Sequence, residues 1–238
     1  MINTIRFNNN DLTSVYGVSY DGSQLFDTPD KDVTFFPIPG KNGDLSISND
    51  RFNNIEISIN CFIRTNFKEN YSNLINFLAS QEGYGRLETS TEDDIYREAA
   101  FVKGIQPDTG AFLKYGQFTL VFNCKPQKWL KSGEVAINLT STTTTVNNPT
   151  NFTAKPLFEM VSTGRITIGS NAVQLTANTS TTFIDSEIQD AYEGTINRNG
   201  DLIIANGFPV LVPGGNTITL SSRGNDFALK MYPRWWKL

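Results

Sequence analysis

The sequence predicts a mainly β protein with one helix, in which a β-rich α+β half is followed by a β-sandwich. Three observations predict this class. Apolar residues alternate with period two along most of the chain, as in IEISINCFI at residues 55–63. One segment, residues 67–80, has apolar residues at helical spacing. In the second half, turn residues separate short strands roughly every eight to twelve residues.

Length and composition limit the possible functions. The 238 residues suffice for one large β domain or two small ones. Charged residues make up only 18% of the chain and the net charge is −4. A nucleic-acid-binding surface needs clustered basic residues, and the most basic feature is the scattered set Lys125, Lys128 and Lys131. We therefore expect no specific binding of nucleic acid.

The chain shows no targeting pattern. No apolar run reaches the roughly 18 residues of a membrane span. The first residues, MINTIRFNNN, lack the basic start and apolar run of a signal peptide. We expect a protein that is made in a cytoplasm and does not enter a membrane.

The first clear strands are expected at residues 32–38, 44–49 and 54–64. The stretch PIPGKNGDL, residues 37–45, connects the first two. Pro39-Gly40 predicts a type II turn, and Asn42-Gly43 predicts a type I′ turn. Two turn signals this close together predict a stiff, protruding loop that carries Lys41 and Asp44.

The predicted helix follows these strands. Its apolar residues lie on one stripe: Phe67, Tyr71, Leu74, Ile75 and Leu78. Asn66 is expected to be the N-cap, with Glu69 in the capping-box position, and Gly83 is expected to end the helix. The strands on either side supply the sheet that this stripe covers.

A hairpin and a long strand complete the first half. The acidic run Glu92, Asp93 and Asp94 is interpreted as a solvated hairpin tip. GQFTLVFNCKPQKWL is interpreted as the last strand of the first domain. Thr-rich short strands then replace the Phe-rich strands. We therefore place a first domain at residues 1–130 and a second at 131–238, with the boundary near 126–134.

The Thr- and Asn-rich stretch NLTSTTTTVNNPTNFTAKP begins the second half. It is either a flexible linker or an edge strand followed by a loop. We favour the edge strand, because Thr favours strands and clear strand patterning follows. Turns are expected at three places: Gly169-Ser170-Asn171, Asn199-Gly200 and Gly214-Gly215.

The residues needed for most catalysis are missing. The chain has no histidine, which removes the commonest general base, nucleophile partner and metal ligand. Its two cysteines, Cys61 and Cys124, cannot build a usual zinc site and lie on apolar strand faces. We interpret them as buried, reduced thiols. We predict a protein that is not an enzyme and that has no cofactor and no metal.

Two alternatives concern the second half. Asp185, Glu187 and Asp190 could supply a carboxylate pair for glycoside hydrolysis, but turn chemistry explains Asp185 more simply. The tryptophans could stack on sugars, although we favour a role in anchoring the strands that carry them. They are Trp129, Trp235 and Trp236.

Several stretches together resemble a known family. VTFFPIPGKNGDLSISNDRFNNIEISINCFI, the helix after it, FTLVFNCKPQKW, NPTNFTAKPLFEM, FIDSEIQDAY and YPRWWKL follow one another in the order and spacing of a siphophage distal tail protein. The resemblance covers nearly the full length. Its specificity lies in this order, since no single motif decides it.

The resemblance implies a fold and a role. It implies that the first domain closes a hexameric ring and that the second is a galectin-like or carbohydrate-module-like β-sandwich. Such a ring joins the major tail tube protein to a tail-associated tip protein and to receptor-binding proteins, and DNA passes through it. The location implied is the tail tip of a virion assembled in a bacterial cytoplasm. Some family members carry an inserted carbohydrate-binding module, for which 238 residues leave no room.

The sequence therefore leads to two hypotheses. The first is a structural hub ring, with residues Gly40, Lys41, Asn42, Gly43 and Asp44 at or beside the contact between subunits. The second is a carbohydrate-binding β-sandwich that acts in host adsorption.

Overall fold

The computed structural model describes residues 3–21, 27–110, 114–177 and 180–238. They form two compact units, Met1–Lys128 and Trp129–Lys237, with Leu238 grouped with the first. Each unit has its own hydrophobic core. The prediction of a mainly β fold is confirmed. That the two units fold independently stays a prediction.

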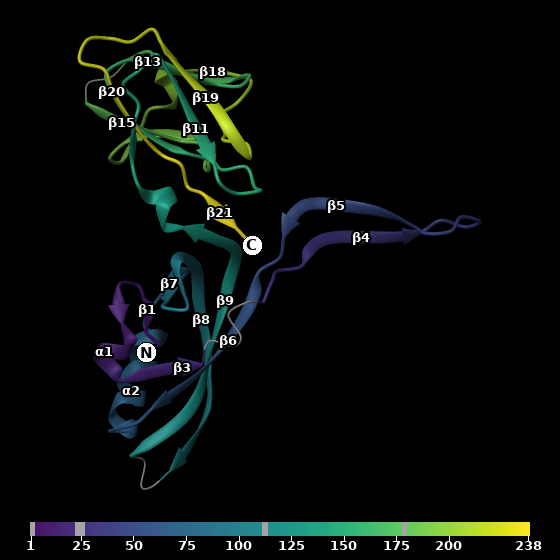
Figure 1. Cartoon of the computed structure of the whole chain (residues 1–238), viewed down its shortest axis with the longest axis vertical. Coiled ribbons are helices and arrows are strands. Elements are labelled where there is room, and N and C mark those ends of the chain that lie inside the picture. Colours follow the sequence, from purple (N-terminus) through teal and green to yellow (C-terminus); the bar gives the residue numbers. More distant parts are fainter. Residues whose placement is uncertain (1–2, 22–26, 111–113, 178–179) are drawn as a thin grey trace. The chain divides into compact units, whose positions relative to one another are not determined.

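The N-terminal unit is built on one curled sheet (Figure 1). Its strand order is β2-β1-β7-β8-β9-β6-β3. The curl brings β1 into contact with β3, and the Asn3 side-chain amide donates to the carbonyl of Tyr20 at 3.2 Å. The strands are β1 (Ile5–Phe7), β2 (Asn10–Asp11), β3 (Val18–Asp21), β6 (Ile55–Ile63), β7 (Gly85–Thr89), β8 (Glu92–Gly110) and β9 (Tyr115–Leu130).

The long helix α2 (Phe67–Ala79) lies where the sequence predicts it and contacts β6 and β8. Phe67, Leu74 and Leu78 on its apolar stripe are buried in the core of the N-terminal unit. Because these residues are seven and four positions apart, they lie on one side of the helix, and this side closes the curled sheet.

Helix α2 starts at the predicted N-cap, Asn66, but its side-chain cap and its end at Gly83 differ from the prediction. Asn66 has a left-handed backbone (φ 51°) and its side chain makes no capping hydrogen bond. A residue whose side chain caps a helix typically has an extended backbone. The helix ends at Ala79, and Gly83 lies beyond it with a φ of 68°.

A second, short helix was not predicted. It is α1 (Leu12–Tyr16), which contacts α2 and buries Leu12. Asp11 caps it by accepting from the backbone N–H groups of Thr13 and Ser14. Gly17 ends it with a φ of 68°. An Asp and a Gly that bracket a few residues are a recognisable cap signal, but a single turn of helix shows no periodicity.

Strands β4 (Lys31–Pro37) and β5 (Asp44–Phe52) form a separate sheet of two strands. Figure 1 shows them as a long hairpin, which we call the arm. Within the described residues, neither strand pairs with the curled sheet. The arm is therefore a part of the N-terminal unit that lacks a core of its own.

The C-terminal unit is a β-sandwich of two sheets, as predicted. The first has the order β10-β20-β12-β15-β16-β17 and the second β11-β19-β13-β14-β18. Their strands are β10 (Ile137–Asn138), β11 (Thr143–Asn148), β12 (Leu157–Val161), β13 (Gly164–Ile168), β14 (Asn171–Leu175), β15 (Thr181–Asp185), β16 (Asp190–Glu193), β17 (Ile196–Asn197), β18 (Leu202–Ala205), β19 (Gly214–Ser221) and β20 (Ala228–Tyr232). Short 3-10 helices span Lys131–Glu134 and Asn199–Asp201, and β21 (Trp236–Lys237) ends the chain.

The Thr-rich stretch forms β11, which lies at the edge of the second sheet, so the edge-strand interpretation is confirmed. The turn after Ile168 is also confirmed, since Ile168 pairs with Asn171 around Gly169 and Ser170. The turn expected at Gly214-Gly215 is wrong, because both glycines pair within β19.

Candidate functional site: the exposed arm

The two faces of the arm both carry apolar side chains. Thr34 pairs with Ile47 and Phe36 pairs with Leu45, which places these four residues on one face. Phe35 lies on the opposite face, beside Ser46. The large apolar side chains on the two faces are 47% to 62% exposed: Phe35, Phe36, Leu45 and Ile47.

Such a hairpin is an unusual object in water. Two strands alone are at most marginally stable, because they cannot bury a hydrophobic face. Large apolar groups that gather on an exposed surface mark a site of interaction. A hydrogen-bonded ion pair between Arg51 Nε and Asp32 Oδ2, at 2.7 Å, fastens the base of the arm. The hydrogen bond from Arg51 lowers the pKa of Asp32. Among the described residues, β4 and β5 pair only with each other, and their apolar side chains form an exposed surface.

The tip of the arm comprises residues 38–44, which are the loop between the two strands and Asp44 at the start of β5. The backbone N–H of Lys41 donates to the carbonyl of Ile38 at 3.2 Å, and Gly40 has a φ of 78°. This is the geometry predicted for a type II turn at Pro39-Gly40.

The type I′ turn predicted at Asn42-Gly43 is wrong. Gly43 has a φ of 83°, but Asn42 is not among the described residues with positive φ. A type I′ turn needs positive φ at both positions. The wide loop between Pro37 and Asp44 closes without the two-residue turn that a tight hairpin would require.

The five residues expected at a subunit contact all lie at this end of the arm. Gly40, Lys41, Asn42, Gly43 and Asp44 are all exposed. The sequence did not indicate the much larger apolar surface behind them, because an alternating strand is normally taken to bury one face.

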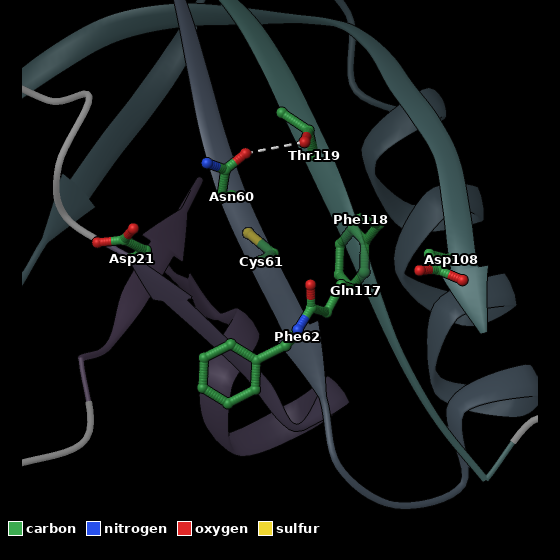
Figure 2. A pocket seen from close by; sticks show the side chains of 8 residues that line it. All are labelled: Asp21, Asn60, Cys61, Phe62, Asp108, Gln117, Phe118 and Thr119. Carbon is green, nitrogen blue, oxygen red and sulfur yellow. Dashed lines mark hydrogen bonds between the residues drawn. The ribbon is translucent and has the colours of Figure 1, made fainter. Parts of the chain in front are cut away.

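A groove lies on the outer face of the curled sheet, across the neighbouring strands β8, β9, β6 and β3 (Figure 2). Its volume is about 510 Å³. Asn60 and Thr119 form its middle, and Thr119 Oγ1 donates to Asn60 Oδ1 at 3.0 Å. Asp21 on β3 and Asp108 on β8 flank them on either side. No local sequence pattern indicates this groove, because its residues come from four separate strands.

The acidic run at residues 92–94 is not simply a solvated tip. Glu92 Oε1 lies 2.9 Å from Lys128 Nζ, and its Oε2 lies 3.7 Å from Arg97 Nη2. All three side chains are largely buried. Burial lowers the pKa of Arg97. Lys128 is thus part of an internal cluster and does not offer its charge to a phosphate.

The carboxylates considered for glycoside hydrolysis have structural contacts. Asp185 accepts from the backbone N–H of Glu187 at 2.9 Å, which is the turn role that the sequence predicted. It is also paired with Arg234, a partner that sequence reasoning missed. Glu187 lies 3.5 Å from Lys155, and Asp190 accepts from the backbone of Ala191.

Two of the tryptophans anchor the end of the chain, as favoured from the sequence. Trp235 is buried in the core of the C-terminal unit. Trp236 stacks on Phe152 with ring centroids 4.2 Å apart and donates from its indole N–H to the carbonyl of Thr153. Trp129 is half-buried in β9. These contacts leave little aromatic surface for a sugar.

The two cysteines are buried and free. Cys61 pairs with Phe118 and Cys124 with Ile55, at opposite ends of the β6–β9 ladder, so they cannot form a disulfide. Burial raises the pKa of each thiol to about 12. Among the described residues, no three Cys, Asp or Glu side chains are grouped to hold a metal, and no helix is long and apolar enough to cross a membrane.

The family comparison addresses the same unit that carries the arm and the groove. The sequence profile of the phage tail protein RIFT-related domain matches residues 7–124, about half of the chain. The chain belongs to this phage tail protein family. The resemblance to siphophage distal tail proteins drawn from the sequence is confirmed. A comparison with curated protein sequences finds no match.

Solved structures show that the likeness of this phage tail protein extends over the whole chain. The crystal structure of SPP1 Dit (gp 19.1), described as a paradigm of the hub adsorption apparatus in phages that infect Gram-positive bacteria, matches with a TM-score of 0.74. Identity is 14%, and the match covers 100% of both chains. Chains of the phage P2 baseplate in its activated conformation match with TM-scores of 0.55 (calcium form, 12% identity) and 0.54 (strontium form, 9% identity). Both cover 97% of this chain and 98% of the other.

Proposed function

We propose that this phage tail protein forms the hub ring at the distal end of a long, non-contractile tail. In this role it joins the major tail tube protein to a tail-associated tip protein and to receptor-binding proteins, without catalysis. The ring is a homohexamer through which DNA passes without specific binding. It belongs to the tail tip of the virion and assembles in the cytoplasm of the host bacterium.

The arm is the observation that carries this proposal. Its exposed apolar faces need a partner, and a surface presented by one copy to a different surface on the next makes a head-to-tail contact. Contacts of this type close into a ring when the rotation between copies closes. The match with a hub protein over the full length supports a closed ring over an open filament.

We further propose that residues 40–44 in the tip of the arm lie at or beside the contact between neighbouring subunits. Lys41 and Asp44 are exposed and lie on a loop whose ends are fixed by strand pairing. Replacing both with Ser keeps the two turn dipeptides. Rings of the double variant with unchanged mass and unchanged resistance to salt would show that the tip is only a turn.

Solution mass tests the ring. Light scattering at micromolar concentration is expected to give six times the 26.5 kDa of the chain, and negative-stain images are expected to show rings. Two stacked rings are expected at high concentration. A mass of one chain under these conditions would contradict ring formation by the free protein.

Location and sugar binding are tested separately. Immunogold labelling of purified virions should mark the end of the tail that is distal to the head, and labelling elsewhere would contradict the hub role.

The alternative function, a carbohydrate-binding module, predicts strong specific binding on a glycan array and a monomer in solution. The anchored tryptophans and the full-length likeness to a hub protein make it the less favoured role.

A further inference from the structure

The groove on the curled sheet continues into a second depression. A neighbouring cavity of about 420 Å³ shares Phe62 and Gln117 with it and adds Arg64 and Tyr115. The Arg64 guanidinium lies 5.2 Å from the centre of the Phe62 ring, and Tyr115 is exposed. The two cavities together form one open, partly apolar depression. We call it the sheet groove.

The sheet groove has opposite charges at its two ends. The larger cavity is lined by Asp21 and Asp108, and none of its described lining residues is basic. The smaller cavity is lined by Arg64, and none of its described lining residues is acidic. The aromatic rings of Phe62 and Tyr115 lie toward the end with Arg64. A matching ligand would carry a cation, an anion and an apolar group close together.

The tip of the arm has this combination. Lys41 and Asp44 supply the two charges, and the exposed Ile38 and Leu45 flank them. The stem behind the tip consists of paired strands, so the tip is held out on a stiff support. Within the part of the chain that the structure describes, the tip of the arm is exposed and the sheet groove is an open depression.

We propose that the sheet groove of one copy of this chain receives the tip of the arm of a second copy. Lys41 of the entering tip faces the end lined by Asp21 and Asp108, and Asp44 faces Arg64. The apolar flanks of the tip cover the exposed rings. This inference rests on the proposed ring, since it names the surface on the neighbouring subunit that the arm occupies. Each copy then gives one tip and receives one, which is the arrangement that a closed ring requires.

Exchange of charges tests the pairing. Lys41→Glu and Asp108→Lys should each lower the affinity between subunits roughly threefold to tenfold, because each brings like charges together at a partly exposed contact. The double variant, with the two charges exchanged, should recover affinity. The readout is the protein concentration at which rings dissociate, measured by mass photometry. The matched control combines Lys31→Glu, at the base of the arm, with Asp108→Lys, and should show no recovery.

Cross-linking locates the contact directly. A chain with Lys41→Cys is mixed with a separate chain carrying Asp108→Cys, and disulfide formation is followed on a non-reducing gel. Cys61 and Cys124 do not interfere, since both are buried and their pKa values are about 12. Covalent dimers are expected from the mixture. A partner carrying Glu56→Cys, an exposed position on β6 outside the sheet groove, should give few.

The outcomes separate this inference from the ring itself. Rings of normal mass with no recovery in the exchanged pair, or with equal cross-linking to Glu56→Cys, would overturn docking in the sheet groove and leave the hub function standing. A wild-type chain that stays monomeric, together with no cross-link between the Lys41→Cys and Asp108→Cys chains, would overturn both. Recovery together with selective cross-linking would establish the arm and the sheet groove as the two halves of the subunit contact.

Discussion

Arg234 holds Asp185 through both nitrogens of its guanidinium. Nη1 lies 2.7 Å from Oδ1 and Nη2 lies 2.9 Å from Oδ2. Asp185 ends β15, and Arg234 lies between β20 and β21, so the pair ties the end of the chain to the first sheet of the sandwich. Burial acts to raise the pKa of Asp185, but the hydrogen bonds and the charge of Arg234 outweigh it, and the net shift is downward.

We predict that Asp185→Asn destabilises the C-terminal unit by roughly 3 kcal/mol, because it leaves the half-buried Arg234 without its counter-charge. Urea unfolding at pH 7 measures this. Glu187→Gln is the matched control, since Glu187 is two residues away and its pair with Lys155 is exposed. It should change the free energy of unfolding by less than about 0.5 kcal/mol. Equal effects of the two changes would contradict the special role of the buried pair.

The same pair predicts a dependence on pH. The pKa of Asp185 is lower in the folded protein than its unfolded value of about 3.9. The folded state therefore binds the proton less well, and the stabilisation is fully present above about pH 4. It is lost as the pH falls through the folded pKa. Between pH 5 and pH 2 the wild-type C-terminal unit should lose more stability than the Asp185→Asn variant. If the free energies of unfolding of the two proteins fall in parallel with pH, Asp185 is not the group responsible.

A second prediction concerns the buried cluster of the N-terminal unit. Glu92→Gln should destabilise this unit by roughly 3 kcal/mol, because it removes the counter-charge that lies 2.9 Å from the buried Lys128 ammonium. The control is Glu98→Gln, whose pair with Lys125 is largely exposed. Thermal unfolding measures the stability of the two variants, and only Glu92→Gln should lower the melting temperature strongly. A double variant, Glu92→Gln with Lys128→Met, should cost less than the sum of the two single changes, since the charges act as a pair.

Local sequence patterns were enough to predict much of this fold. The stripe of apolar residues at 67–80 fixed the position of α2, because a helix can bury only one side against a sheet. The run of threonines gave the edge strand β11, since β-branched residues suit an extended backbone. Each prediction depended on neighbours within a few residues along the chain.

The failures arose where distant residues decide the outcome. Glu92 looked solvated because its partner Lys128 is 36 positions away. Asn66 lies at the N-cap as predicted, but its backbone is left-handed and its side chain makes no capping hydrogen bond. The sheet groove had no local signal, since Asp21, Asn60, Gln117 and Asp108 meet only after four strands have paired.

Limited proteolysis tests the predicted domain boundary. We expect early cleavage near residues 126–134 or within 146–155, because the change in composition along the chain places the junction of two separately folded pieces there. Two folded fragments, each with cooperative thermal unfolding, should result. Cleavage confined to other places, with one core that resists division, would show that the two units of the structure do not fold independently.

The arm gives the sharpest prediction about assembly. Phe36→Ser with Leu45→Ser removes two paired apolar side chains from one face of the arm. Both are about half exposed in the single chain, so the melting temperature of the monomer should change little. In the ring the same side chains are expected to be covered, and burying a Phe or Leu contributes about 1.5–3 kcal/mol. The affinity between subunits should therefore fall by more than tenfold, and the solution mass should approach 26.5 kDa.

The matched control is Ile203→Ser with Ile204→Ser on β18, two isoleucines exposed to a similar extent in the C-terminal unit. Rings that survive the change in the arm but not the change in β18 would place the subunit contact on the sandwich and contradict the role proposed for the arm.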